Sequence, residues 1–131
     1  MADQKEFAEL DFLERVAIRL PDDEAVLKAL ADLYTKVGLY EKGLELDRKL
    51  VRLCAPEPLV WYNLACSLAL LNRRAEAMEA LAQAVRLGYR DYQWMSEDTD
   101  LRSLQNEQAF KALLQQIAAR SSKTEKHGGT P

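Results

Sequence analysis

The chain has 131 residues, which suits one domain that is long enough to bury a core. Hydrophobic residues make up 48% of it and charged residues 30%, a composition that excludes an intrinsically disordered chain. The formal net charge of −3 lacks the basic excess that nucleic-acid binding needs, and no apolar run is long enough to span a membrane. We therefore expect no nucleic-acid partner and no membrane insertion.

Glycine and proline are scarce, with 5 and 4 copies, and this scarcity favours nearly continuous helix. The N-terminal residues lack the pattern of a secretory signal, which indicates a cytoplasmic protein. Two cysteines, Cys54 and Cys66, form neither a disulfide framework nor a zinc set. We therefore expect no metal site and no cofactor.

The first predicted element is an N-terminal capping helix over residues 3–20. Its apolar residues recur at helical spacing and should form one buried stripe, closed by Pro21. The stripe consists of Phe7, Leu10, Leu13, Val16 and Leu20.

A repeat follows, because the chain matches itself when it is shifted so that Leu27 falls on Trp61. With this one shift, four residues of the first unit, Leu27, Leu30, Ala31 and Tyr34, fall on Trp61, Leu64, Ala65 and Leu68 of the second. The stripe in each unit predicts a helix, a tight turn and an antiparallel helix. We place the first unit at residues 24–57 and the second at 58–91. Such pairs bury their apolar faces by stacking on their neighbours.

These residues resemble the tetratricopeptide repeat (TPR) family, whose 34-residue pattern is W-x2-L-G-x2-Y, then A-x3-F, then proline. Trp61-x2-Leu64-Ala65-x2-Leu68 with Ala77-x3-Leu81 carries the resemblance, and the first unit matches through the residues given above and Gly43. The resemblance implies an all-α fold, a right-handed superhelical stack of about 6–7 helices. Asp47 departs from the pattern, because the family has a bulky apolar residue there. It predicts either a looser second helix or a contact with a partner.

The remaining chain predicts a degenerate repeat that caps the stack at residues 92–120. A short helix should begin near Asp91, and Asp98 should cap a further turn that Leu101 and Leu104 anchor. A final amphipathic helix is expected from Glu107 to Arg120, with Phe110, Leu113, Leu114 and Ile117 on its apolar face. This block resembles the C-terminal ends of bacterial TPR proteins. Residues 1–120 thus form one domain, and residues 121–131 are predicted to be a flexible tail.

Catalytic chemistry has no visible basis in the sequence. The single histidine, His127, lies in the predicted tail, and no Ser-His-Asp or Cys-His arrangement can be built around it. Cys66 has no basic neighbour in sequence that would lower the pKa of its thiol. The acidic residues between Asp91 and Asp100 lack the spacing and the central glycine of a calcium loop. We therefore expect a protein that is not an enzyme.

A partner is expected in the concave groove, which the first helix of each pair lines in a repeat stack. The residues opposite the buried stripes are the candidates for contact: Lys28, Asp32, Leu59, Tyr62, Asn63 and Cys66. The segment Leu59–Leu71 is apolar nearly all round. Two readings fit it: the C-terminal block covers it through Trp94 and Met95, or it is an apolar groove floor open to a partner.

One binding mode of the family is disfavoured. Some TPR modules clamp a C-terminal carboxylate, and Lys28 and Asn63 match two of the residues that do so. Asp32 would repel a carboxylate, however, and the third-repeat basic positions fall on Gln93 and Glu97. The leading hypothesis is an adaptor that binds a protein or peptide in its groove. The alternatives are a homo-oligomerising scaffold, such as a homodimer, and a small chaperone for a secreted subunit.

Overall fold

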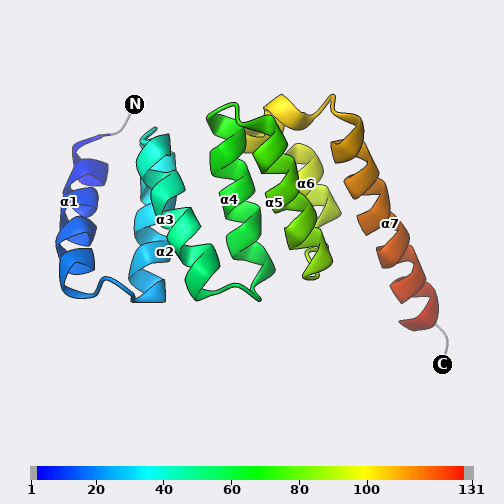
Figure 1. Ribbon diagram of the computed structural model, residues 1–131, viewed down its shortest axis with the longest axis horizontal. Coiled ribbons are helices and arrows are strands. Elements are labelled where there is room, and N and C mark those ends of the chain that lie inside the picture. The colour runs from blue at the N-terminus through cyan, green and yellow to red at the C-terminus, as the bar shows by residue number, and fades with distance from the viewer. Residues whose placement is uncertain (1–2, 129–131) are drawn as a thin grey trace.

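The computed structural model describes the backbone of residues 3–128 and the side chains of residues 3–120. Every regular element in this part of the chain is a helix, so the predicted all-α class is confirmed. Helices α1 to α5 form a row in which each packs against the next (Figure 1). The elements are α1 (Gln4–Arg19), α2 (Glu24–Lys36), α3 (Tyr40–Leu53), α4 (Pro58–Leu70), α5 (Arg74–Arg86), α6 (Tyr92–Glu97), the 3-10 helix η1 (Thr99–Leu104) and α7 (Gln108–Gly128).

The two central helix pairs recur with the period found in the sequence. The same shift that relates the two sequence units carries the start of α2, Glu24, onto the start of α4, Pro58. It also carries the start of α3, Tyr40, onto the start of α5, Arg74. Short turns join the two helices of each pair, which therefore run antiparallel (Figure 1). The apolar stripe predicted in α2 is buried, and in α4 the equivalent residues are buried except for Trp61, which is half-buried.

The turns inside the two pairs share one backbone geometry. Gly38 and Asn72, which occupy equivalent positions in the two units, both have positive φ, at 86° and 61°. In each turn the following residue donates its backbone N–H to the carbonyl five residues earlier, at 2.8 Å. This bond satisfies a carbonyl that the helix end would otherwise leave without a partner. The left-handed residue suits glycine and is tolerated by asparagine.

Helix α1 packs against α2 on one side only. Leu10 is buried against Leu30 and Tyr34, and Leu13 is partly buried beside them. The expectation of a buried stripe is wrong for Phe7 and Leu20, which are 54% and 47% exposed. They are exposed because, within the described residues, α2 is the only helix that packs extensively on α1.

Helix α4 is buried on nearly every side. It packs between α3 and α5, and η1 covers a further face. Among its residues only Leu59 and Asn63 are exposed. The reading in which the C-terminal block covers this helix is therefore the correct one. Met95 of α6 is fully buried in the same apolar cluster as residues of α4, whereas Trp94 stays 58% exposed.

The C-terminal block folds back on the second helix pair. Leu101 and Leu104 are completely buried, which confirms them as anchors, and so are Phe110 and Ile117 of α7. Asp98 caps η1 as predicted, since its carboxylate accepts a hydrogen bond from the backbone N–H of Asp100. The Ser103 hydroxyl adds a hydrogen bond to the carbonyl oxygen of Ala69 in α4, at 3.2 Å.

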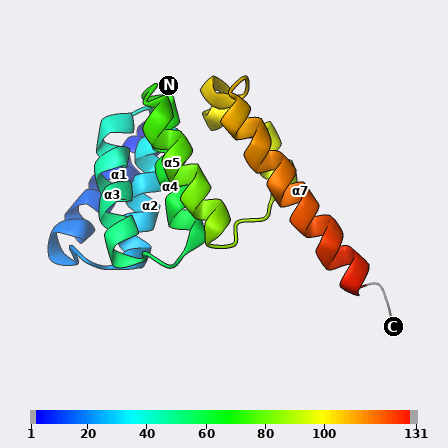
Figure 2. The same cartoon turned by 45° about the vertical axis from the view of Figure 1, so that its right-hand side comes forward.

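Helix α7 is longer than the sequence indicated. It continues to Gly128 instead of ending at Arg120, and its far end points away from the row of α1 to α5 (Figure 2). The predicted tail therefore begins with helical backbone, and residues 129–131 lie outside the described part of the chain. Among the described helices, none combines the length and the apolar character that a membrane span requires.

Candidate binding pocket

A cavity of about 180 Å³ lies where α2, α3 and α4 meet the C-terminal block. Its lining combines apolar side chains with several carboxylates, one amino group and one exposed indole. The lining residues are Lys28, Ala31, Asp32, Thr35, Asp47, Leu50, Val60, Tyr62, Asn63, Cys66, Ser67, Trp94, Asp98 and Asp100. Segments far apart in the chain thus build a single cavity.

The cavity brings together five of the six residues that the sequence placed in the groove. Lys28, Asp32 and Asn63 line it from exposed positions, and Tyr62 and Cys66 line it from buried ones. Leu59 lies elsewhere: its side chain is 62% exposed and does not contribute to the lining. Of the two readings of α4, the open apolar floor is therefore not the one seen: these residues line a cavity whose walls combine apolar and acidic side chains.

Asp98 is held in the cavity wall by three donors. The Tyr62 hydroxyl donates to its Oδ2 at 2.7 Å, and the Cys66 thiol approaches the same oxygen at 3.7 Å. Its other oxygen receives the N–H of Asp100. Burial and then the nearby Asp98 charge raise the pKa of the Cys66 thiol well above its usual value. Cys66 is therefore a protonated thiol at neutral pH, a poor nucleophile.

The Tyr62 ring has a second fixed partner. It stacks on Tyr89 with ring centroids 4.4 Å apart and planes 10° from parallel. Burial, followed by the hydrogen bond to Asp98, raises the pKa of the Tyr62 hydroxyl, which stays protonated. Tyr62 is thus held in place by two contacts, and its hydrogen bond to Asp98 joins α4 to the C-terminal block.

Asp47 is the most deeply buried carboxylate in the cavity, with 4% of its surface exposed. The Ser67 hydroxyl donates to its Oδ2 at 2.5 Å. Burial raises the pKa of Asp47 to about 6; the Ser67 hydrogen bond opposes this shift and the charge of Asp32 adds to it. α3 is continuous through this position, so the predicted loosening is not seen.

Two further carboxylates, Asp32 and Asp100, face the same space. Burial and the charges of Asp98 and Asp32 raise the pKa of Asp100. Among the described residues, Lys28 is the only lysine or arginine in the lining, and its Nζ lies 3.3 Å from both carboxylate oxygens of Glu57. The cavity is therefore electrostatically negative.

The sequence-based prediction did not include several residues that line the cavity. Asp98 was read as a helix cap, which it is, but it also faces Tyr62 across the fold. Asp47 stood out as a departure from the repeat pattern, and this was the one available signal. Nothing in the sequence indicated that Ser67 would be its partner, because a small residue in an apolar helix fits equally well as simple packing.

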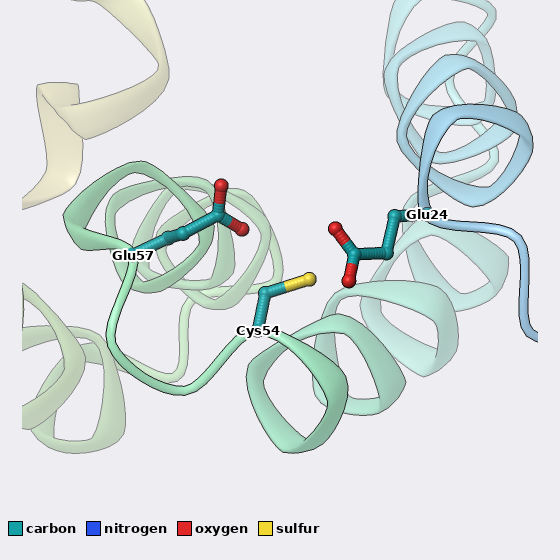
Figure 3. Close-up of side chains that lie close together, drawn as sticks. All are labelled: Glu24, Cys54 and Glu57. Atoms are coloured by element: carbon teal, nitrogen blue, oxygen red, sulfur yellow. The ribbon is translucent and has the colours of Figure 1, made fainter.

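A second cluster lies outside the cavity, at the turn between α3 and α4. Glu24 and Glu57 approach the Cys54 thiol from two sides (Figure 3). Burial, with hydrogen bonds to Glu57 and Glu24, raises the pKa of Cys54 to about 11. The cluster thus brings together the ends of three helices, since Glu24 begins α2, Cys54 follows α3 and Glu57 precedes α4. A metal ion would have to displace the thiol proton and compete with Lys28 for Glu57.

Within the described residues, these features define a helical protein with an acidic cavity between packed helix pairs. No protein-family model matches the chain. It is similar to a chloroplast protein of Arabidopsis thaliana, with 34% identity over 87 residues. The match covers 64% of this chain and 26% of that protein, so the chain spans about a quarter of the relative's length.

Proposed function

We propose that this chain is a TPR-like interaction module that binds a protein or peptide segment at the cavity between α2, α4 and the C-terminal block. The observation that carries the proposal is the cavity itself, which collects exposed polar side chains from two repeats and an exposed Trp94 at one place. Exposed aromatic residues beside polar groups are typical of protein-binding surfaces. The common period of the two helix pairs supports a repeat stack, and the resemblance to the TPR family implies that the stack is right-handed.

The chemistry of the cavity supports binding over catalysis. The Tyr62 hydroxyl donates a hydrogen bond to Asp98, and the Ser67 hydroxyl donates one to Asp47. Both are structural contacts within the fold. Its thiol has a raised pKa, and no histidine occurs among the lining residues that the structure describes. The one hydroxyl beside a buried carboxylate, that of Ser67, is itself only 2% exposed, so a substrate has little access to it in the described structure. We infer a cytoplasmic adaptor with no catalytic role.

Affinity capture with matched variants tests this proposal. The full chain is immobilised, and proteins retained from the native host are identified and quantified for wild type, Trp94→Ala and Glu79→Gln. Trp94 is exposed at the cavity, whereas Glu79 is exposed on α5 and lines a different hollow. We expect a specific partner that Trp94→Ala loses and Glu79→Gln retains. Equal retention by both variants would place the binding surface elsewhere.

A homo-oligomerising scaffold is a second candidate, favoured by the exposed apolar residues of α1. Ile18 is 80% and Phe7 54% exposed, and their spacing places them on one side of the helix. Ile18 also borders an apolar groove formed with α2 and α3. Sedimentation at several concentrations tests this candidate. An oligomer that Ile18→Glu dissociates would support it, and a wild-type monomer at all concentrations would exclude it.

A further inference from the structure

We infer that the cavity recognises an arginine side chain of a partner peptide, whose guanidinium lies among Asp32, Asp47 and Asp100. The inference rests on the proposed function, because it names the group that would anchor a partner in the cavity. Three observations support it: the cavity is lined by aspartates, these aspartates form no ion pairs with described lysines or arginines, and the volume and lining of the cavity suit one side chain.

Among the described lining residues, four are aspartates and one, Lys28, is a lysine. Asp32 comes from α2, Asp47 from α3, and Asp98 and Asp100 from the segment that begins η1. The ammonium of Lys28 lies against Glu57, which is not part of the lining. A cation is therefore the ligand that this wall attracts.

These carboxylates have no cationic partner in the described structure. Asp32, Asp47 and Asp100 form no ion pair with any described lysine or arginine, although Asp47 is almost completely buried. Asp47 has one hydroxyl donor, Ser67, for a group that can accept several hydrogen bonds. Buried carboxylates are normally paired, so an external donor would complete this arrangement.

The dimensions of the cavity suit one side chain. Its volume of about 180 Å³ lies below the range of roughly 300–1,000 Å³ that drug-sized ligands and cofactors occupy. Ala31, Leu50 and Val60 supply apolar wall beside the carboxylates. An aliphatic stem with a charged head matches such a lining, because the stem contacts the apolar wall and the head reaches the acids.

The spacing of the acids favours an extended cation over a metal ion. Within the described residues, the only group of three or more ligand atoms in this cavity that could share one ion is that of Cys66, Asp98 and Asp100, which lie within 4.8 Å of one another. Asp32 and Asp47 do not belong to that group. A guanidinium presents five N–H donors in a plane and can reach carboxylates on different helices. Trp94, at the cavity, adds an aromatic surface on which a guanidinium stacks.

A displayed library of random short peptides, selected on the immobilised full chain in the presence of EDTA, tests the inference. The peptide that binds best is resynthesised with each arginine replaced in turn by citrulline, its neutral isostere. Affinities are measured for wild type, for Asp32→Asn/Asp100→Asn, and for Glu9→Gln/Glu41→Gln. The last variant removes the same charge from exposed positions outside the cavity. Circular dichroism checks that all three fold.

We expect an enriched arginine whose replacement by citrulline weakens binding by about tenfold or more. The aspartate variant should weaken binding to a similar degree, and the glutamate variant should remain within about twofold of wild type. Peptides that bind without arginine, or equally well to the aspartate variant, would overturn the inference but leave the interaction module standing. In a parallel selection with calcium in place of EDTA, peptides that bind only when calcium is present would assign the aspartates to a metal ion and would also overturn the inference. A selection that enriches no peptide would overturn the proposed function and the inference together.

Discussion

Replacement of Asp47 by asparagine should stabilise the protein at neutral pH. The folded state holds the pKa of Asp47 at about 6, against 3.8 for the free side chain, so ionisation opposes folding. Because the folded state binds the proton more tightly, the unfavourable contribution is absent at low pH and grows as the pH rises from 3.8 towards 6. Asparagine retains an oxygen that can accept from Ser67 and carries no charge.

The magnitude follows from the size of the shift. A shift of about two units corresponds to about 3 kcal/mol at pH values well above 6, and to about 1 kcal/mol near pH 4.5. The amide nitrogen of asparagine would take the place of the carboxylate oxygen that does not accept from Ser67, in a residue that lines the cavity. Asp47→Asn should therefore gain stability that increases by about 2 kcal/mol between those two conditions.

Urea denaturation of wild type and Asp47→Asn at both pH values measures this difference, and Glu41→Gln serves as a control at an exposed position of the same helix. Subtraction of the wild-type free energy of unfolding removes the contribution of groups that titrate equally in both proteins. A loss of stability at neutral pH, or a gain that does not change with pH, would show that Asp47 is ionised without penalty and would refute the reasoning.

Three further predictions concern other parts of the molecule. Met95→Ala should lower the free energy of unfolding by about 2–5 kcal/mol, because the side chain is fully buried in the largest apolar cluster of the described residues, and urea titration measures this loss. Gly38→Ala should cost about 1–2 kcal/mol by the same assay, since φ there is 86°, while a substitution at exposed Lys36 should have little effect. Cys54 should react with iodoacetamide much more slowly than a free thiol at neutral pH, because its pKa is about 11; reaction at the rate of a free thiol would contradict this.

The helix pairs could be predicted from the sequence because their signals are local. The stripe of Leu27 and Leu30 recurs in the second unit, and Gly38 and Pro58 lie where a helix must end or begin. The register of α2 to α5 follows from these features alone. The exposure of Phe7 on α1 was not predictable in this way, because it depends on whether another element covers that side.

The cavity could be predicted only in part. The candidate residues of α2 and α4 share one side of the stack, which helical spacing indicates. The acidic wall from Asp98 and Asp100 depends on how the C-terminal block folds back, and no periodicity governs that contact. Tyr62 was expected to be open to a partner, and instead its hydroxyl is bound by this block. Asp47 was recognised as unusual, but its burial against Ser67 required the packing of α3 on α4.

One part of the cavity is built by helices α2, α3 and α4, which follow one another in the chain. The other part comes from the C-terminal block, and the hydrogen bond from Tyr62 to Asp98, 36 positions apart, joins the two parts. Helix pairs in a row can open one after another, and end segments open at the lowest free energy. The cavity is therefore complete only in molecules in which α6 and η1 are docked. Amide hydrogen exchange in these two elements would then report the fraction of molecules competent to bind, and an occupied cavity would slow exchange there as well as at the contact itself.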